Sequence, residues 1–422
     1  MRIAFGFDIF YPESNGVITT TINLANNLID MGHEVYFFVP SDKDFKDDVI
    51  ENGIRIIRVK ALPTFIYKGI KLLPVQSWYL RKYFEKYRFD VIHDTSPWLI
   101  CQAMNHAARR MHIPVLATHH TLIDNPIYIK YALKSQTLAE AAQKPIWSVV
   151  FNPFFRLVWM VTAPNRETVK TVKDHVDGID VRYVSNGIDI SQFDTDGVYH
   201  PIREIPDGWV GRNTFLFVGR LGFEKAIDIT LEGFAKAAAL RPEIKLIVIG
   251  DGPAHRELME IARELRISDR VLFTGKIDNH ILIHSNILKN VNSFVTSSLS
   301  ENQAITVIEA ICSGCPVICP DVFNMREIVK DDAGWYFEGN DADSLAQRLV
   351  HVIDNPAERD EKGQAAAKYR ELYDGKKVAK QFEAIYRELL EMKKNGFYVY
   401  DGQKKAYKFE QELKQYYDKR KH

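Results

Sequence analysis

The sequence has few cysteines, no net charge and no long apolar run. Its 422 residues include four cysteines, and 55 Lys and Arg residues balance 55 Asp and Glu residues. The start, MRIAFGFDIFYP, reads as a first strand and not as a signal peptide, so we expect a protein of the reducing cytoplasm. The balanced charge gives no global field that would attract a polyanion, so we expect no nucleic-acid partner.

The least charged segment, residues 145–161, carries Arg156 as its one charged residue and is interrupted by Asn152-Pro153. A stretch of this length lies at or below the lower limit for a helix that spans a bilayer. We therefore predict a helix followed by a buried strand at residues 158–163.

Two ligand motifs are also missing. The sequence has no Gly-x-Gly-x-x-Gly dinucleotide fingerprint, which disfavours an NAD-dependent oxidoreductase. Cys312, Cys315 and Cys319 are spaced as C-x2-C-x3-C, but no His follows at the distance of a zinc finger. We predict that these thiols pack in the core, and that the protein needs no metal because no Asp-x-Asp pair ends a strand.

The chain does contain two successive runs of alternating strands and helices. The first begins with a strand at residues 2–7 and a helix at 17–31, and the alternation restarts with a strand at 214–218. The length favours two domains. We predict two doubly wound α/β domains at 1–189 and 190–375, a helix at 376–394 that crosses back to the first domain, and a basic, aromatic tail at 395–422.

The most informative stretch is TSSLSENQAITVIEAICSGCPVICP, residues 296–320. A strand at 292–296, a loop and a helix at 305–312 place Glu301 at the carboxyl end of a strand and Glu309 one helical turn inside. Parallel α/β sheets bind ligands at this edge, where the first amides of a helix attract anions. Taken alone, two glutamates eight positions apart are more often a solvated face or an ion pair.

The order of residues in this stretch resembles the donor-site signature of the retaining glycosyltransferases of family 4, which have the GT-B fold. That fold has two Rossmann-like domains with parallel sheets that face each other across a cleft. The resemblance implies that Glu301 faces the transferred sugar and that Glu309 holds the ribose of a nucleotide sugar. Ala304 departs from the family, which usually has Gly there, and its methyl group would narrow the pocket or restrict the backbone.

Other parts of the chain extend the resemblance. In FVGRLGFEK, Arg220 and Lys225 match the residues that grip the donor diphosphate, and in THHT His120 matches the active-site histidine, with His119 at the variable position. The alternative for both histidines is a solvated strand end. The resemblance implies catalytic roles for His120, Glu301, Arg220 and Lys225, and contacts to the nucleotide sugar from Gly16, Gly219, Arg220, Lys225, Gly275, Lys276, Ile277, Asn302, Gln303, Ala304, Ile305, Thr306 and Glu309. The donor is then a substrate, and we expect no cofactor.

The sequence gives the least information about the acceptor substrate. THHT and the sugar loop ENQ are similar to the bacterial diacylglycerol glucosyltransferases within the family, which favours UDP-glucose as donor and a membrane lipid as acceptor. A basic, aromatic helix at 78–88 and the apolar segment 147–159 are candidate contacts with the inner face of the cell membrane, although both patterns also suit helices of a soluble domain. The tail is either a solvated helix or a further anionic-surface contact.

Alternative functions are a transferase that uses GDP-mannose and a polysaccharide or other soluble acceptor, and a protein that binds a nucleotide sugar without turnover.

Overall fold

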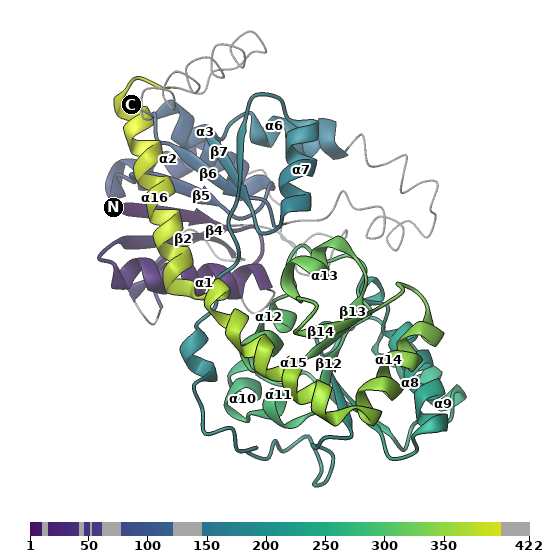
Figure 1. The fold of residues 1–422 in the computed structure, drawn as a ribbon. Helices are drawn as coiled ribbons and strands as arrows, with labels where there is room; N and C mark the ends of the chain where they lie inside the picture. The colour runs from purple at the N-terminus through teal and green to yellow at the C-terminus, as the bar shows by residue number, and fades with distance from the viewer. Residues whose placement is uncertain (11–15, 42–45, 51–52, 61–76, 121–145, 398–422) are drawn as a thin grey trace, which may run out of the picture. The chain divides into compact units, whose positions relative to one another are not determined.

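The computed structural model describes residues 1–10, 16–41, 46–50, 53–60, 77–120 and 146–397, which form two units (Figure 1). Unit 1 contains the described residues up to Ile188 and those from Gly375 onward, and unit 2 contains Asp189–Asp374. The last described helix, α16 (Gly375–Lys394), therefore belongs to the same unit as the first strand. The basic tail, from residue 398 onward, lies outside the described residues.

Unit 1 is built on a sheet whose described strands have the order β3-β4-β2-β1-β5-β6-β7-β8 (Figure 1). Neighbouring strands pair in parallel except β3, which pairs antiparallel with β4 and was not predicted from the sequence. The inner strands are buried, as expected for parallel strands between helices. The strands are β1 (Arg2–Gly6), β2 (Glu34–Ser41), β3 (Lys46–Val49), β4 (Arg55–Lys60), β5 (Val91–Asp94), β6 (Val115–Thr118), β7 (Met160–Ala163) and β8 (Asp180–Tyr183).

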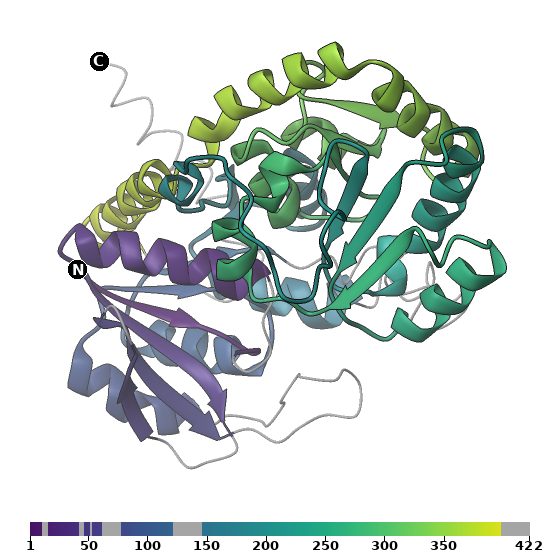
Figure 2. The same ribbon diagram turned by 90° about the horizontal axis from the view of Figure 1, so that it is seen from below.

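The helices of unit 1 cover this sheet, and α1 and α16 lie side by side (Figure 2). Their contact is close where the chain re-enters unit 1, because a Cβ added to Gly375 would lie 2.7 Å from the Asn23 amide nitrogen. The same amide donates to the Gly187 carbonyl at 2.8 Å. Besides α16 the helices are α1 (Gly16–Asp30), α2 (Ser77–Tyr87), α3 (Leu99–Arg110), the π-helical turn η2 (Trp147–Phe151), α6 (Asn152–Phe155) and α7 (Arg166–His175).

The apolar segment 147–159 is part of the core of unit 1. Trp147, Phe151, Phe154, Phe155 and Trp159 are all buried, and Trp147 and Phe151 have ring centroids 4.8 Å apart. The prediction of helix and then strand is confirmed, since η2 and α6 precede β7. The five aromatic rings are packed against the protein, whereas Val149 in the same segment is 72% exposed, so a membrane contact here stays a prediction.

Unit 2 contains a parallel sheet whose described strands have the order β11-β10-β9-β12-β13-β14. The strands are β9 (Thr214–Val218), β10 (Lys245–Ile249), β11 (Val271–Gly275), β12 (Ser293–Val295), β13 (Val317–Pro320) and β14 (Gly334–Phe337). The helices are η3 (Ile190–Phe193), η4 (Phe223–Lys225), α8 (Ile227–Leu240), α9 (His255–Glu264), α10 (Asn279–His284), α11 (Ile287–Asn290), α12 (Ile305–Cys312), α13 (Phe323–Ile328), α14 (Ala342–Asp354), α15 (Pro356–Lys368) and η5 (Tyr369–Tyr373).

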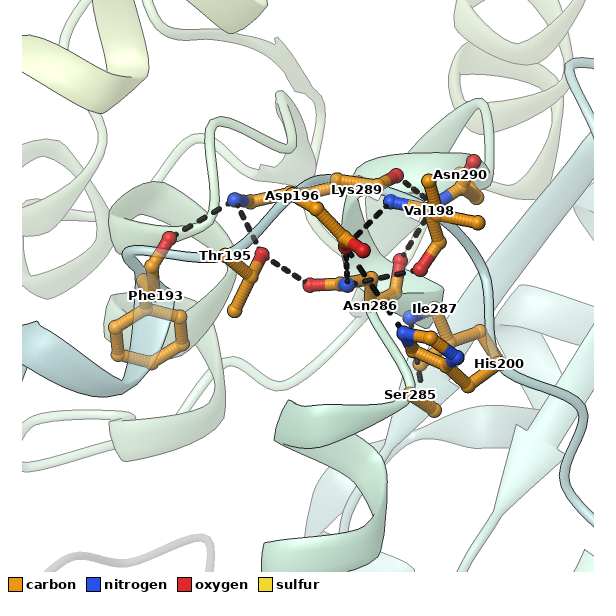
Figure 3. A network of polar contacts seen from close by, with 11 residues as sticks. Phe193, Thr195, Asp196, Val198, His200, Ser285, Asn286, Ile287, Lys289 and Asn290 are labelled. Carbon is orange, nitrogen blue, oxygen red and sulfur yellow. Dashed lines mark hydrogen bonds and ion pairs between the residues drawn. The ribbon is translucent and has the colours of Figure 1, made fainter.

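A polar network holds the chain that enters unit 2 against α10 and α11 (Figure 3). Lys289 Nζ donates to the Phe193 carbonyl and to Thr195 Oγ1, each at 2.8 Å. Buried Asn286 accepts from Thr195 and donates to the Val198 carbonyl at 2.8 Å. Asn286 also has a φ of 57°, a left-handed conformation that Asn tolerates better than most residues. The side chain of Asn286 thus provides a hydrogen-bond partner for the backbone of an irregular segment.

We predict that Asn286→Ala lowers the unfolding free energy of unit 2 by about 2 kcal/mol, because it removes buried hydrogen bonds and strains a left-handed residue. Asn286→Gly relieves the strain and recovers part of the loss. Urea denaturation checks both variants, with Asn213→Ala as the control, since the Asn213 amide donates to Glu243 at the exposed surface. A loss for Asn286→Ala no larger than that for the control would contradict a structural role for the network.

Candidate active site

The parallel pairing of β9 with β12 brings two loops of unit 2 together. Leu216 pairs with Phe294, so both strands end at the same edge of the sheet. The loop after β9 carries Arg220 and Lys225, and the loop after β12 carries Glu301. This edge lies where the strand order reverses around β9, which is the ligand-binding position of open parallel sheets.

Lys225 and Glu301 form an ion pair across this edge. Lys225 Nζ donates to Glu301 Oε1, and the side chains are 18% and 14% exposed. The Asn324 amide donates to the Glu301 carbonyl at 2.7 Å and fixes the backbone of the loop from the side of α13. Arg220 is exposed at the same strand end. The ion pair and the exposed Arg220 thus lie at a sheet edge where a ligand with phosphate and hydroxyl groups would bind.

Close backbone approaches shape the turn that carries these residues. A Cβ at Gly250 would lie 1.8 Å from the Gly219 carbonyl oxygen, so the turn after β10 can pass that close only with glycine. Ala226, directly after Lys225, has a φ of 46° and precedes α8. The turns after β9 and β10 are therefore packed closely at this edge of the sheet.

The loop 302–304 leads into α12, whose first amides point out of the helix without intrahelical acceptors. Ala304 is the residue before the helix and has φ −74° and ψ 104°, an ordinary conformation for a residue with a Cβ. This conformation needs no glycine, and the effect of the methyl group on the pocket stays a prediction. Ala304 is also almost fully buried, so its methyl group presents little surface to a ligand. The amides of Ile305 and Thr306 open the helix toward the same edge of the sheet.

Glu309 lies buried on α12, with the side chain of Asn279 as its partner. The Asn279 amide donates to Glu309 Oε1 at 2.9 Å. Burial raises the pKa of Glu309 to about 7, and this hydrogen bond offsets only part of the shift. A small internal space lined by Val218, Asn279, Thr306 and Glu309 adjoins the carboxyl group. A carboxylate of this kind is suited to accept hydrogen bonds from ligand hydroxyls.

The end of β11 lies two strands from β9 at the same edge. Gly275 has a φ of 74°, its carbonyl accepts from Gly250 at 2.9 Å, and Lys276 beyond it is exposed while Ile277 is buried. The structure thus brings the predicted donor residues of unit 2 to one sheet edge. Asn279 and Asn324 were not predicted, because a single asparagine on a short helix has no recognisable pattern.

Two predicted residues belong to unit 1. Gly16 is exposed as the first residue of α1, and His119 and His120 directly follow the end of β6 at Thr118. His119 is buried and lies edge-on to Phe151, with ring centroids 4.9 Å apart, and burial lowers its pKa to about 3. His120 is partly exposed, and its pKa is lowered to about 4 by burial, so it is neutral at pH 7. The alternative of solvated histidines is therefore wrong for His119.

The prediction that the cysteines pack in the core is confirmed, since all four thiols are buried and none of them forms a disulfide. Burial raises the pKa of Cys312 to about 12 and that of Cys315 to about 11, which makes them inert. In the part of the chain that the structure describes, no group of three or more His, Cys, Asp or Glu side chains is placed to hold a metal ion. No described helix is long and apolar enough to cross a bilayer.

We predict that the burial of Glu309 makes stability depend on pH. The folded pKa of about 7 lies above the usual value of 4.5, so the folded state holds this proton more tightly than the unfolded state. This contribution is full below pH 4.5 and is lost as the pH rises to 7. Glu309→Gln should therefore gain about 2 to 3 kcal/mol relative to wild type between pH 5 and pH 8. Thermal unfolding at both pH values checks this, with exposed Glu264→Gln as the control, and parallel pH profiles for wild type and Glu309→Gln would contradict it.

Family models match both halves of the chain. Residues 14–192 match the model "Glycosyltransferase Family 4", and residues 203–369 match "Glycosyl transferases group 1". The alpha-monoglucosyldiacylglycerol synthase of Streptococcus pneumoniae is 27% identical over 84% of this chain and 79% of its own length. The enzyme of the same name from Acholeplasma laidlawii is 26% identical over 93% of this chain and 98% of its own length. A GDP-mannose-dependent alpha-mannosyltransferase of Mycobacterium tuberculosis is 28% identical over 78% of this chain and 81% of its own length.

Solved structures share the fold. Sucrose-phosphate synthase from Thermosynechococcus elongatus superposes with a TM-score of 0.71 at 20% identity and covers 92% of this chain and 98% of its own. HepE from Anabaena, in complex with UDP-glucose, superposes with a TM-score of 0.68 at 15% identity. The superposition covers 92% of this chain and 100% of HepE. The predicted GT-B fold is confirmed by these likenesses together with the two parallel sheets. The chain is a glycosyltransferase with the GT-B fold, and it is similar to the glycosyltransferases of family 4.

Proposed function

We propose that the protein is a retaining hexosyltransferase that moves glucose from UDP-glucose to a membrane lipid such as diacylglycerol. The observation that carries the proposal is the meeting of Arg220, Lys225 and Glu301 at the ends of two paired strands, with Glu309 on the adjoining helix. The likeness to two alpha-monoglucosyldiacylglycerol synthases over most of the chain supports the lipid acceptor.

Each donor-site side chain has a role that follows from its chemistry. Arg220 and Lys225 stabilise the charge that grows on the leaving diphosphate, which is the kind of interaction that lowers a barrier most. Lys225 turns from Glu301 to the diphosphate, and Glu301 then accepts hydrogen bonds from the sugar. Glu309 accepts from the ribose hydroxyls. Gly275, Lys276 and Ile277 lie against the base through their backbone.

The remaining steps concern the acceptor. In a retaining reaction the departing phosphate takes the proton of the acceptor hydroxyl on the same face of the sugar, so no separate base is needed there. His120, neutral at pH 7, donates to or accepts from a sugar hydroxyl and orients the reacting carbon. The amides of Asn302, Gln303 and Ala304 complete the contacts to the sugar. No cofactor or metal enters this scheme.

The second candidate function is the transfer of mannose from GDP-mannose to a soluble acceptor, which the 28% identity to a GDP-mannose-dependent enzyme favours. A panel of radiolabelled UDP-glucose and GDP-mannose, each with diacylglycerol vesicles or with oligosaccharides, distinguishes the two. Label in a lipid extract from UDP-glucose alone supports the proposal. Label in a soluble product, or no transfer from any donor, overturns it.

The membrane surface that we propose is the basic face of α2. Leu80 and Phe84 of this helix are buried, whereas Arg81, Lys82 and Lys86 are exposed and Tyr79 and Tyr87 are partly exposed. Arg81 and Lys86 are 63% and 58% exposed but pair with Glu85 and Asp47. These carboxylates weaken the attraction, which for an isolated basic residue near an anionic membrane is about 1 kcal/mol.

We predict that Arg220→Ala and Lys225→Ala each lower kcat by about 10² to 10³, because the leaving group gains charge only as its bond breaks. Release of UDP from UDP-glucose in the presence of diacylglycerol vesicles measures this. Lys236→Ala is the matched control, because Lys236 lies on α8 and pairs with Asp343 at the exposed surface. Turnover near that of the control in both variants would rule out the diphosphate role.

Charge reversal of α2 tests the membrane surface. We expect the wild type to sediment with anionic vesicles at low salt, and the triple change of Arg81, Lys82 and Lys86 to Glu to release it. The control reverses Lys236, Arg256 and Arg263, which changes the net charge equally but lies on α8 and α9 of unit 2. If the α2 variant and the control bind vesicles alike, α2 is not the attachment surface.

A further inference from the structure

A buried chain of hydrogen bonds crosses the sheet of unit 1 directly before the histidine turn. The Tyr386 hydroxyl on α16 lies 2.7 Å from His93 Nδ1, and His93 Nε2 lies 2.6 Å from Thr118 Oγ1. Thr118 Oγ1 lies 2.7 Å from Thr162 Oγ1. All four side chains are at least 95% buried. The chain thus connects α16 with the adjacent strands β5, β6 and β7.

The hydrogen bonds of this chain run in one of two directions. Burial lowers the pKa of His93 to about 3 and raises that of Tyr386, so both groups are neutral at pH 7. A neutral imidazole has one donor and one acceptor nitrogen. Either the Tyr386 hydroxyl donates to Nδ1 and Nε2–H donates to Thr118, or Thr118 donates to Nε2 and Nδ1–H donates to the Tyr386 hydroxyl. In both directions each ring nitrogen is hydrogen-bonded.

The chain ends where the turn THHT begins. Thr118 is the last residue of β6, and His119 and His120 follow it. The His119 amide donates to the Thr162 carbonyl at 2.8 Å, and the His120 amide donates to the Thr118 carbonyl at 3.1 Å. The side chain of Thr118 is thus held from both sides, and its backbone sets the position of His120.

A histidine is not needed at position 93 for packing alone. Its ring lies between Phe5 and Phe382, with centroid distances of 4.9 and 5.2 Å, so an aromatic hydrocarbon would fit the surroundings. A buried polar ring costs free energy unless every polar atom is paired, and here both nitrogens are. The polar ring is therefore better explained by the geometry that its two hydrogen bonds impose.

We propose that His93 is a positioning residue for His120, and that the clamp Tyr386–His93–Thr118–Thr162 fixes the histidine turn from the C-terminal helix α16. The inference rests on the proposed function, because it takes His120 as the group that orients the reacting sugar. It adds residues whose side chains do not touch the substrate.

The first test uses changes that remove one polar atom each. Tyr386→Phe and Thr118→Val should lower kcat by about tenfold and leave the KM for UDP-glucose unchanged, because His120 is displaced while donor binding in unit 2 is not altered. Thr118→Ser should recover most of the loss. Tyr36→Phe is the matched control, since the buried Tyr36 donates to Glu34 away from the clamp. Equal kcat values for Tyr386→Phe and this control would overturn the proposal.

The second test does not depend on catalysis. Histidine ¹⁵N spectra of the full chain should show His93 as a single neutral tautomer, and Tyr386→Phe should shift the signals of both His93 and His120. His120→Gln and His93→Gln assign the two sets of signals. A shift at His93 with none at His120 would overturn the positioning role. If the wild type transfers no sugar, the proposed function fails, but the ¹⁵N shifts still decide whether the clamp acts on His120.

Discussion

The pairing of β9 with β12 is the contact on which the donor site depends. These two parallel strands fix the ends of two loops that lie far apart in the sequence, and Lys225 meets Glu301 across 76 positions. The pairing is short, because β12 spans only Ser293–Val295. A slip of one residue would turn the side chains of β12 to the opposite face and carry Glu301 away from the cations. The buried strands on both sides of this pair therefore serve the site as well as the core.

The two glutamates of the site have different partners and therefore different properties. Glu301 is paired with Lys225, so neither charge is held alone in a poorly solvated place when no donor is bound. In the proposed function a diphosphate would offer Lys225 a stronger partner and release Glu301 for sugar hydroxyls. Among the described residues no cation pairs with Glu309, and the Asn279 amide offsets part of the effect of its burial. Ligand hydroxyls that donate to Glu309 favour its ionised form, so donor binding and the loss of this proton support each other.

Much of the fold could be predicted, because strands and helices have local periods. Helix α12 has the predicted bounds 305–312, and β9 has the predicted bounds 214–218. The edge strand β3 was missed because its sequence, KDDV, has no apolar alternation. The clamp was missed for another reason, since His93 and Tyr386 are 293 positions apart and only the return of α16 to unit 1 brings them together. Local patterns cannot predict a hydrogen bond of that kind.

The structure also limits how a lipid acceptor would be reached. Aromatic residues in an apolar segment suggest insertion into a bilayer, but Trp147, Phe151 and Phe155 instead form the packing around His119. They stabilise the backbone that carries His120, while Val149 in the same segment is 72% exposed. On α2 the exposed Arg81 and Lys86 pair with Glu85 and Asp47, and Tyr79 and Tyr87 are partly exposed. Attachment through the charges of α2 would be electrostatic, salt-sensitive and easily reversed. Such attachment would suit the proposed lipid acceptor, whose product stays in the membrane.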